Sequence, residues 1–354
     1  MSRRIAVAIS GGIDSMVAAY LLKEQGHEVF AVHFVTGFEK APDASLPEPG
    51  STPQDIHAVG RQLGIAVQMV DLRQEFQRDV VDYFSASYFS GETPNPCIVC
   101  NPRIKFGALL RFAQAAGAAA LATGHYARAV EDPSGRFRLY KGADPQKDQS
   151  YFLARLAQDQ LARAVFPLGG LTKSHVRAIA AGRGLKPAAA EESQDVCFIR
   201  EGTYKDFIAG RGKQLFEPGL IEDIAGNLIG EHPGLHAFTI GQRRGINCPA
   251  AEPYYVVRRD MERNRLVVGA KKDLLAVECR VARINWIAPP PRGPIRVHTR
   301  LRYRSREVLS TLTPAGEQAA AVTFDTPQTA VTPGQTAVFY DGEEVLGAGF
   351  IAQT

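Results

Sequence analysis

The sequence predicts an α/β domain at the N-terminus, then a small central module, and last a β-barrel. Short apolar runs alternate with helical patterns over the first 125 residues. Short strand patterns broken by turns replace them after about residue 210, and helical patterns almost disappear beyond Val281. A chain of 354 residues is long enough for two or three domains. We therefore expect domains at 1–208, 209–275 and 276–354.

The N-terminal elements follow from hydrophobic periodicity and from helix start and stop signals. Gly26 ends the first predicted helix, and Pro53 suits the first turn of the second. Strands that alternate with helices are typical of a doubly wound parallel sheet. The predicted strands cover 5–9, 28–35, 65–70 and 118–123, and the predicted helices cover 15–25 and 53–63.

The remaining segments are punctuated by turn-forming residues. Residues 36–53 are rich in Pro, Gly, Ser and acidic groups, which predicts a long loop. Gly and Asn, Pro and Gly, or Asp and Gly pairs predict turns at 226–227, 233–234 and 341–342. The Pro-rich stretch 288–294 is a linker or a loop between strands.

Composition excludes several classes of protein. The chain is 45% hydrophobic and 22% charged, which is ordinary for a globular protein and excludes a disordered one. An apolar run of about 18 residues is absent, which excludes a transmembrane helix, and the apolar run after Arg4 is too short for a signal peptide. We therefore expect a cytoplasmic protein with no membrane partner. The net charge of +4 permits nucleic acid as a partner without requiring it.

A glycine-rich turn, Ser-Gly-Gly-Ile-Asp-Ser at 10–15, joins the first strand to the first helix. Glycines let backbone N–H groups turn inward as an anion nest, and a helix N-terminus adds partial positive charge. The turn contains no Lys, so it is not a Walker A loop, and its pattern is not the dinucleotide fingerprint either. A tight turn without a ligand is the alternative.

The turn resembles the SGGxDS loop of the ATP pyrophosphatase (PP-loop) superfamily, whose fold is like that of the adenine nucleotide alpha hydrolases. The resemblance implies cleavage of ATP to AMP and pyrophosphate, adenylation of a substrate oxygen, and Mg²⁺ held with the help of Asp14. It implies ATP contacts from Ala8, Ile9, Ser10, Gly11, Gly12, Ile13, Asp14 and Ser15.

Two of the five cysteines lie three residues apart, at Cys97 and Cys100, in a segment with Pro94 and Pro96. Such a pair is a redox dithiol, half of a zinc site, or two packed side chains. The prolines predict a rigid, irregular loop. Cys197 is far away in sequence, and Cys248 and Cys279 have no surrounding motif, so we expect the last two to be packing residues.

The chain is identified as similar to the tRNA-specific 2-thiouridylase family. That family converts the wobble uridine of the Lys, Glu and Gln tRNAs to 2-thiouridine, and it takes sulfur from a cysteine desulfurase, a sulfur-relay protein or free sulfide. The resemblance is carried in order by residues 93–106, 124–128, 147–153, 193–199, 230–245 and 332–349.

Position by position, the resemblance implies that Cys100 attacks or receives sulfur and that Cys197 carries a persulfide. It implies that Phe34 and Gly124 line the nucleotide. A thiolate-derived sulfur is a strong nucleophile, which suits attack on an adenylated carbon. The residues implied to contact tRNA are Asn95, Pro96, His125, Lys147, Asp148, Gln149, Arg302, Tyr303 and Gln335.

Cys97 departs from the family, whose members usually carry Asp there. Three thiolates, from Cys97, Cys100 and Cys197, can hold a 4Fe-4S cluster and leave one iron open for hydrosulfide. We expect this cluster, with a persulfide or disulfide route and a structural zinc as the alternatives. The segment 32–40 also departs from the usual Asn-Trp pair and acidic run, which affects the loop over the nucleotide.

Basic residues alternate with other types near the C-terminus, with no Asp or Glu between Arg280 and Arg306. In one β-strand this spacing would place every basic group on the same face, where RNA phosphates could bind. Residues 241–245 form a second basic segment, either a turn or an RNA clamp. The alternating basic residues are Arg296, His298, Arg300, Arg302, Arg304 and Arg306.

Two rival functions remain at this point. Another ATP pyrophosphatase, such as an amide-forming enzyme like argininosuccinate synthetase, would need neither the cysteine pair nor the basic strand. A non-enzymatic RNA-binding protein with a structural metal would not need an intact phosphate loop.

Overall fold

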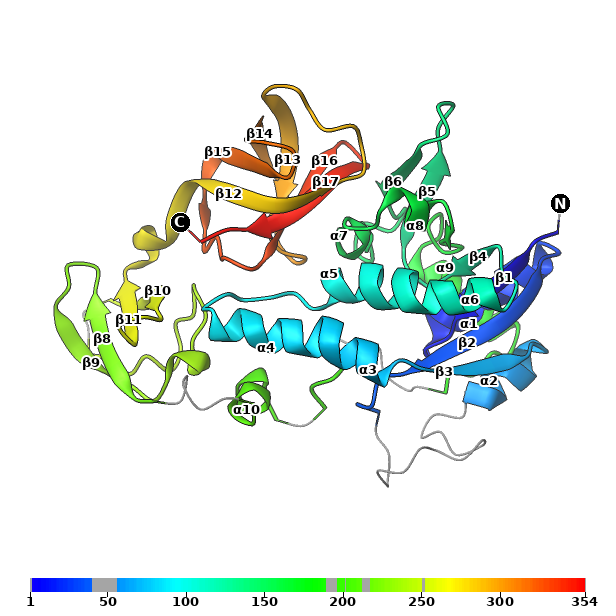
Figure 1. Ribbon diagram of the computed structural model, residues 1–354, viewed down its shortest axis with the longest axis horizontal. Coiled ribbons are helices and arrows are strands. Elements are labelled where there is room, and N and C mark those ends of the chain that lie inside the picture. Colours follow the sequence, from blue (N-terminus) through cyan, green and yellow to red (C-terminus); the bar gives the residue numbers. More distant parts are fainter. Residues whose placement is uncertain are drawn as a thin grey trace.

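The computed structural model describes residues 2–39, 56–188, 196–200, 202–211, 217–249 and 252–353. Figure 1 shows the N-terminal sheet and its helices at one end, the C-terminal barrel above the middle, and the central module at the other end. Within those residues, no helix is long and apolar enough to cross a membrane. The predicted 36–53 loop and the first residues of the predicted 53–63 helix lie largely outside the described residues.

The N-terminal domain contains the predicted parallel sheet, in the order β3-β2-β1-β4-β7. Every neighbouring pair in it is parallel. The prediction of the second strand is confirmed at both ends, and the other predicted strands are confirmed within two residues at most ends. The strands are β1 (Arg4–Ala8), β2 (Glu28–Val35), β3 (Val67–Asp71), β4 (Ala120–Ala122) and β7 (Ala164–Val165).

Helices cover both faces of this sheet, as predicted for a doubly wound fold. Alternate residues of β1 enter different cores, because successive strand side chains point to opposite faces. Ile5 and Val7 pack with α1 (Ile13–Glu24) and α2 (Ile56–Leu63). Ala6 belongs instead to the core that contains the long helices after β3.

Two long helices between β3 and β4 (Figure 1) were not among the predicted elements. Both contain π-helical turns. The first is α3 (Arg73–Phe76), η1 (Gln77–Val81) and α4 (Asp82–Phe89), and the second is α5 (Cys97–Cys100), η2 (Asn101–Leu109) and α6 (Leu110–Ala115). Wide π turns are frequent at functional sites.

The central module is a four-stranded sheet in the order β10-β11-β8-β9 around its own apolar core. The predicted turn at 226–227 joins β8 (Gly219–Asp223) to β9 (Leu228–His232). The other elements are α10 (Tyr204–Ala209), η4 (Leu235–Ala237), β10 (Tyr255–Asp260), β11 (Arg265–Gly269) and η5 (Lys271–Leu274).

The C-terminal domain is a closed antiparallel barrel of six strands, which confirms the predicted barrel. The order β12-β15-β14-β13-β16-β17 closes through pairing of β12 with β17. The Pro-rich stretch 288–294 is the loop between two of its strands. They are β12 (Leu275–Trp286), β13 (Ile295–Arg300), β14 (Val308–Pro314), β15 (Ala319–Thr329), β16 (Thr336–Asp341) and β17 (Glu344–Ile351).

A hairpin from the N-terminal half extends the barrel sheet. It consists of β5 (Ala127–Glu131) and β6 (Phe137–Lys141). Leu139 and Tyr140 of β6 pair antiparallel with β17. The short helices α7 (Ser150–Leu153), α8 (Gln158–Leu161) and α9 (Lys173–Gly182) follow this hairpin.

Candidate functional site

The predicted phosphate loop lies between β1 and α1. Gly11 adopts a positive φ of 83°, which a glycine tolerates without strain. Gly12 is the N-cap of α1, and within the described chain no side chain caps this helix. Ser15 closes the turn, because its hydroxyl accepts from the Ser10 N–H at 3.3 Å and donates to the Gly12 carbonyl at 2.9 Å. An uncapped helix start behind a glycine turn is suited to bind phosphate.

Asp14, in the first turn of α1, is held from two sides. The Lys173 ammonium lies 2.7 and 2.8 Å from its two carboxylate oxygens. The Tyr126 hydroxyl donates to one of the same oxygens at 2.8 Å. The carboxylate is 29% exposed, so it remains open to a ligand from solvent. A single carboxylate together with phosphate oxygens is a typical Mg²⁺ ligand set, so Asp14 fits the metal that the resemblance implies.

Gly124 brings the end of β4 against the phosphate loop. A Cβ at this position would lie 2.8 Å from the carbonyl carbon of Asp14 and 2.9 Å from the Ser15 nitrogen. Only glycine allows this approach of two backbones. Phe34, the other residue predicted beside the nucleotide, is half-buried near the end of β2. Both lie at the carboxyl ends of parallel strands, where such sheets bind ligands.

The predicted irregular loop at the cysteine pair is wrong. Cys97–Cys100 is the first turn of a helix, with Pro96 as its N-cap. Proline suits this place because a helix start has unpaired N–H groups in any case, and its ring fixes φ near the helical value. The Asn95 side-chain oxygen accepts from the Cys97 N–H at 3.2 Å. The prolines therefore begin a helix that carries both thiols.

Cys197 approaches this turn from a distant part of the sequence. Its neighbour Phe198 is 3% exposed. The Phe198 ring packs at 5.2 Å from Phe84, edge to face, and at 5.2 Å from Phe207. Phe198 thereby anchors the described segment 196–200. Residues 193–195 of the same motif lie outside the described residues.

The three thiols share one electrostatic environment. Burial raises the pKa of Cys97 to about 11 and that of Cys100 to about 12, and it also raises the pKa of Cys197. Cys97 and Cys197 nevertheless keep exposed surface. Lys105 opposes the rise in the pKa at all three cysteines. Residue i+5 falls near residue i in a π-helix, so η2 turns Lys105 toward the side of Cys100.

The three cysteines satisfy the requirements of the predicted 4Fe-4S cluster only in part. Their thiolates are the soft donors that iron–sulfur clusters use, and raised pKa values mean that a cation would be needed to keep them ionised. Among the described residues, however, no group of three or more His, Cys, Asp or Glu is arranged to hold a metal ion. The donor chemistry therefore fits a cluster, whereas the arrangement of the side chains does not.

His125 and the three thiols share an electrostatic influence from Lys105. It follows Gly124, is 8% exposed, and its Nδ1 lies 2.7 Å from the Thr123 hydroxyl. Burial, with Lys105 as a second cause, holds its pKa well below the usual value. A neutral imidazole at neutral pH can donate or accept a hydrogen bond but carries no charge toward RNA.

Several residues predicted to contact tRNA also join segments of the protein. Gln149 and Tyr126 exchange backbone and side-chain hydrogen bonds of 2.9 and 3.0 Å. The Gln335 side chain donates to the Thr93 carbonyl at 2.7 Å, which ties the barrel to the segment before Cys97. Asp148 is 5% exposed and accepts from the Gly142 N–H. Lys147 is half-buried, and Pro96 is buried.

The single basic strand face predicted for 296–306 is wrong. The strand β13 ends at Arg300, and bends and a turn follow over the next five residues. Arg300 bonds to Asp148 at 3.3 Å and to the Tyr303 carbonyl, and Arg302 bonds to the Ala330 carbonyl at 2.7 Å. The alternation of basic and other residues in the sequence could not show that the chain turns after Arg300. Arg296, His298, Arg304 and Arg306 remain exposed.

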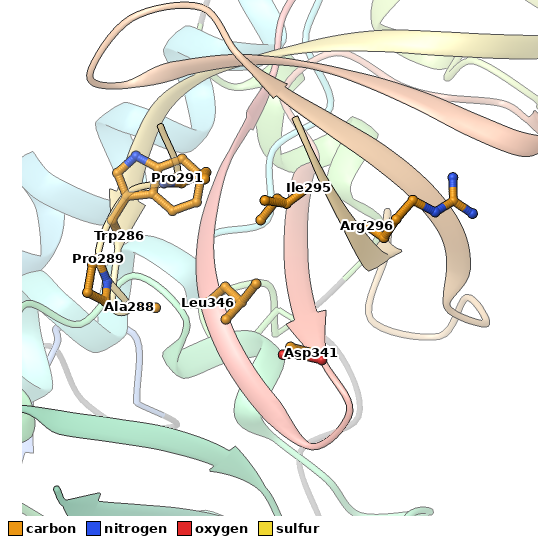
Figure 2. A pocket seen from close by; sticks show the side chains of 8 residues that line it. All are labelled: Trp286, Ala288, Pro289, Pro291, Ile295, Arg296, Asp341 and Leu346. Atoms are coloured by element: carbon orange, nitrogen blue, oxygen red, sulfur yellow. The ribbon is translucent and has the colours of Figure 1, made fainter. Parts of the chain in front are cut away.

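The barrel also carries a hollow of about 400 Å³, beside the Pro-rich loop (Figure 2). Of the residues predicted for the nucleotide, sulfur or RNA sites, Arg296 of the predicted basic face lines it. Its lining is mostly apolar and consists of Trp286, Ala288, Pro289, Pro291, Ile295, Arg296, Asp341 and Leu346.

Sequence reasoning missed three residues of the site: Lys105, Tyr126 and Lys173. Lys105 and Tyr126 lie inside the motifs that carried the resemblance, so their positions were available but their roles were not. Lys173 lies in no motif, and only the packing of α9 against α1 brings it to Asp14. Cys279 is buried in the barrel core and Cys248 packs in the central core, as expected.

Three family models match consecutive parts of the chain. A tRNA methyl transferase HUP domain matches residues 3–201, which is more than half of the chain. A tRNA methyl transferase PRC-barrel domain matches residues 205–270. An aminomethyltransferase beta-barrel domain matches residues 276–351.

Curated relatives match over nearly the full length. A protein of Desulfosudis oleivorans is 56% identical over 98% of this chain and 94% of its own length. Proteins of Geotalea uraniireducens and Moorella thermoacetica are 45% and 46% identical, over 99% and 98% of this chain and 95% and 98% of their own lengths. Each of the three is named tRNA-specific 2-thiouridylase MnmA.

Proposed function

Because the chain belongs to the tRNA-specific 2-thiouridylase family, we propose that it is an ATP-dependent sulfurtransferase that makes 2-thiouridine at the wobble position of the Lys, Glu and Gln tRNAs. The observation that carries this proposal is the continuity between the two halves of the site. Gly124 abuts the phosphate loop, and His125 follows it. Lys105 acts on His125 and on the three cysteines. We propose that a base beside Cys100 also reaches ATP bound at the phosphate loop.

The first step uses the phosphate loop. The uridine C2 oxygen attacks the α-phosphorus of ATP, and pyrophosphate leaves. The loop N–H groups and the α1 N-terminus would bind the pyrophosphate end of ATP. Asp14 would hold Mg²⁺ there, and this cation neutralises charge on the departing pyrophosphate.

The second step uses the cysteines. A sulfur nucleophile attacks C2, and AMP leaves with the former C2 oxygen. On a persulfide route, the terminal sulfur of the persulfide attacks C2, and a second cysteine of the Cys97, Cys100 and Cys197 site then attacks the inner sulfur, which releases 2-thiouridine and leaves a disulfide between the two cysteines. A cellular thiol would have to reduce this disulfide before a cysteine desulfurase or a sulfur-relay protein forms the next persulfide. On a cluster route, the three thiolates would hold the cluster, and free sulfide would supply sulfur that is already at the oxidation level of the product. A 4Fe-4S cluster on the three thiolates and a persulfide on one thiol are two ways to hold that sulfur. The donor set favours the first, and the arrangement of the side chains favours the second.

RNA binding would combine two kinds of contact. Exposed Arg304 and Arg306 are suited to bind phosphates, which position RNA without reading its sequence, whereas the exposed Arg296 is already paired with Asp325. The wobble base would have to leave its stack to reach Cys100, since RNA is read mainly through unstacked bases. We propose that Asn95, Pro96 and Tyr303 contact the base and its neighbours.

Pyrophosphate release tests the overall function. We expect release from ATP to depend on tRNA with an unmodified wobble uridine and to be insensitive to amino-acid substrates. The matched control is the same tRNA with cytidine at the wobble position. Release that ignores tRNA, or that requires an amino acid, would favour an amide-forming synthetase instead.

Iron content distinguishes the two sulfur routes. The protein is purified without oxygen, and iron and sulfide are measured for the wild type, Cys97→Ala and Cys279→Ala. The cluster route predicts iron in the wild type and in Cys279→Ala but not in Cys97→Ala. A wild type that thiolates tRNA without iron, or Cys97→Ala with full iron and activity, establishes that three thiolates do not hold a cluster.

A further inference from the structure

Lys173 supplies an ammonium to a phosphate loop that has no lysine of its own. The loop at 10–15 contains no basic residue. Lys173 is the first residue of α9, and Thr172 caps this helix. Its backbone N–H donates to Asp144 at 2.9 Å, which fixes the start of the helix. From there the side chain spans to Asp14 in the first turn of α1.

The environment of this ammonium differs from that of a surface ion pair. The Lys173 side chain is 7% exposed, and its Nζ lies within 2.8 Å of both Asp14 carboxylate oxygens. Lysines are almost never buried without a charged partner, and removing an ion pair from water is unfavourable. Packing alone does not require an ammonium at this place. A site that receives a polyanion does require one.

We propose that Lys173 is a ligand for the pyrophosphate end of bound ATP and that Asp14 is its counter-ion only in the nucleotide-free enzyme. When MgATP is bound, Lys173 contacts a phosphate oxygen and the Asp14 carboxylate faces the metal. Tyr126 keeps its hydrogen bond to Asp14 and limits how far the carboxylate turns. This inference rests on the proposed use of ATP, and it assigns Lys173 the role that a lysine within the loop has in Walker A proteins.

A structural role is the alternative, in which Lys173 only positions Asp14. Two backgrounds separate the roles. Lys173→Met is made in the wild type and in Asp14→Asn, and binding of ATP, inorganic pyrophosphate and AMP is measured by calorimetry without tRNA. If Lys173 contacts phosphate, the substitution weakens ATP and pyrophosphate binding roughly 10- to 100-fold in both backgrounds, because a charge-assisted hydrogen bond is lost. AMP binding is unchanged.

Lys141→Met is the matched control. Lys141 is also largely buried and ion-paired, with Glu307 at 2.8 Å, but it lies on the β6 strand. It should bind ATP, pyrophosphate and AMP like the wild type. The inference is overturned if Lys173→Met has no effect in the Asp14→Asn background, or if it weakens AMP and ATP equally. A wild type that does not bind ATP overturns the proposed function and this inference together, whereas a wild type that binds ATP regardless of Lys173 overturns the inference alone.

Discussion

Gly124→Ala tests whether the close approach of β4 to the phosphate loop is required. The new Cβ would lie 2.8 and 2.9 Å from backbone atoms of Asp14 and Ser15. Real Cβ atoms essentially never show contacts below 3.0 Å, and a backbone cannot move aside as the end of a side chain can. The loop or the strand end must therefore shift. Such overpacking typically costs about 1–3 kcal/mol.

We expect this free energy to appear mainly as lost ATP affinity, because the displaced atoms belong to the segment that would bind phosphate. A cost of about 1–3 kcal/mol corresponds to roughly 5- to 150-fold in the dissociation constant. The assay is calorimetric titration with MgATP, combined with thermal unfolding. The melting temperature should fall as well, since part of the strain remains in the free protein.

Gly182→Ala is the matched control. Gly182 is the last residue of α9, and apart from its chain neighbours and the backbone of its own helix, no heavy atom of the described chain would lie within 4 Å of its new Cβ. Alanine is the better helix former, so this variant should bind ATP normally and gain up to about 1 kcal/mol in stability. A Gly124→Ala protein with unchanged ATP affinity and melting temperature would refute the reasoning.

Three further predictions concern the thiols, the buried carboxylate and the basic surface. In metal-free protein, we expect the rate of iodoacetamide alkylation at Cys97 and Cys100, measured by mass spectrometry, to rise steadily from pH 7 to 10. Only the thiolate reacts, and burial raises the pKa of these two thiols to about 11 and 12. A rate that stops rising below pH 9 would contradict this. Asp148→Asn should lower the free energy of unfolding by about 3–5 kcal/mol, measured by urea denaturation. The buried carboxylate accepts hydrogen bonds from two backbone N–H groups and from Arg300. A loss below about 1 kcal/mol would show that an amide at this position makes equivalent hydrogen bonds. Arg306→Gln should reduce the slope of log affinity for tRNA against log salt by about 0.7–0.9, and an unchanged slope would place Arg306 outside the RNA contact.

The order of the N-terminal strands and helices could be predicted from the sequence, because the patterns that indicate them are local. Apolar periodicity and the stop at Gly26 located β1, α1 and β2 closely. The two long helices after β3 were not predicted, since their π turns break the regular helical period. Prolines around Cys97 indicated a loop, although Pro96 in fact begins a helix.

The residues of the candidate site were likewise predictable where they lie in local motifs and not where long-range packing brings them together. The phosphate loop and the cysteines lie in contiguous motifs that a sequence can display. Lys173 reaches Asp14 only because α9 packs on α1, a long-range contact with no local signature. Arg300 appeared to belong to an RNA-binding face, but its partner Asp148 is more than a hundred residues away. Propensity and spacing do not report such pairings.

The pairing of β6 with β17 has a consequence for how the chain is made. Leu139 is synthesised early, whereas its partner Val345 emerges from the ribosome roughly 200 residues later. In the interval the outer edge of β6 has no strand to bond, and unpaired edges promote aggregation. Arg138 and Lys141 place positive charge on that edge until Glu344 and Glu307 arrive. The last strand of the barrel therefore also completes the first domain, and truncation before β17 should leave the N-terminal half prone to self-association.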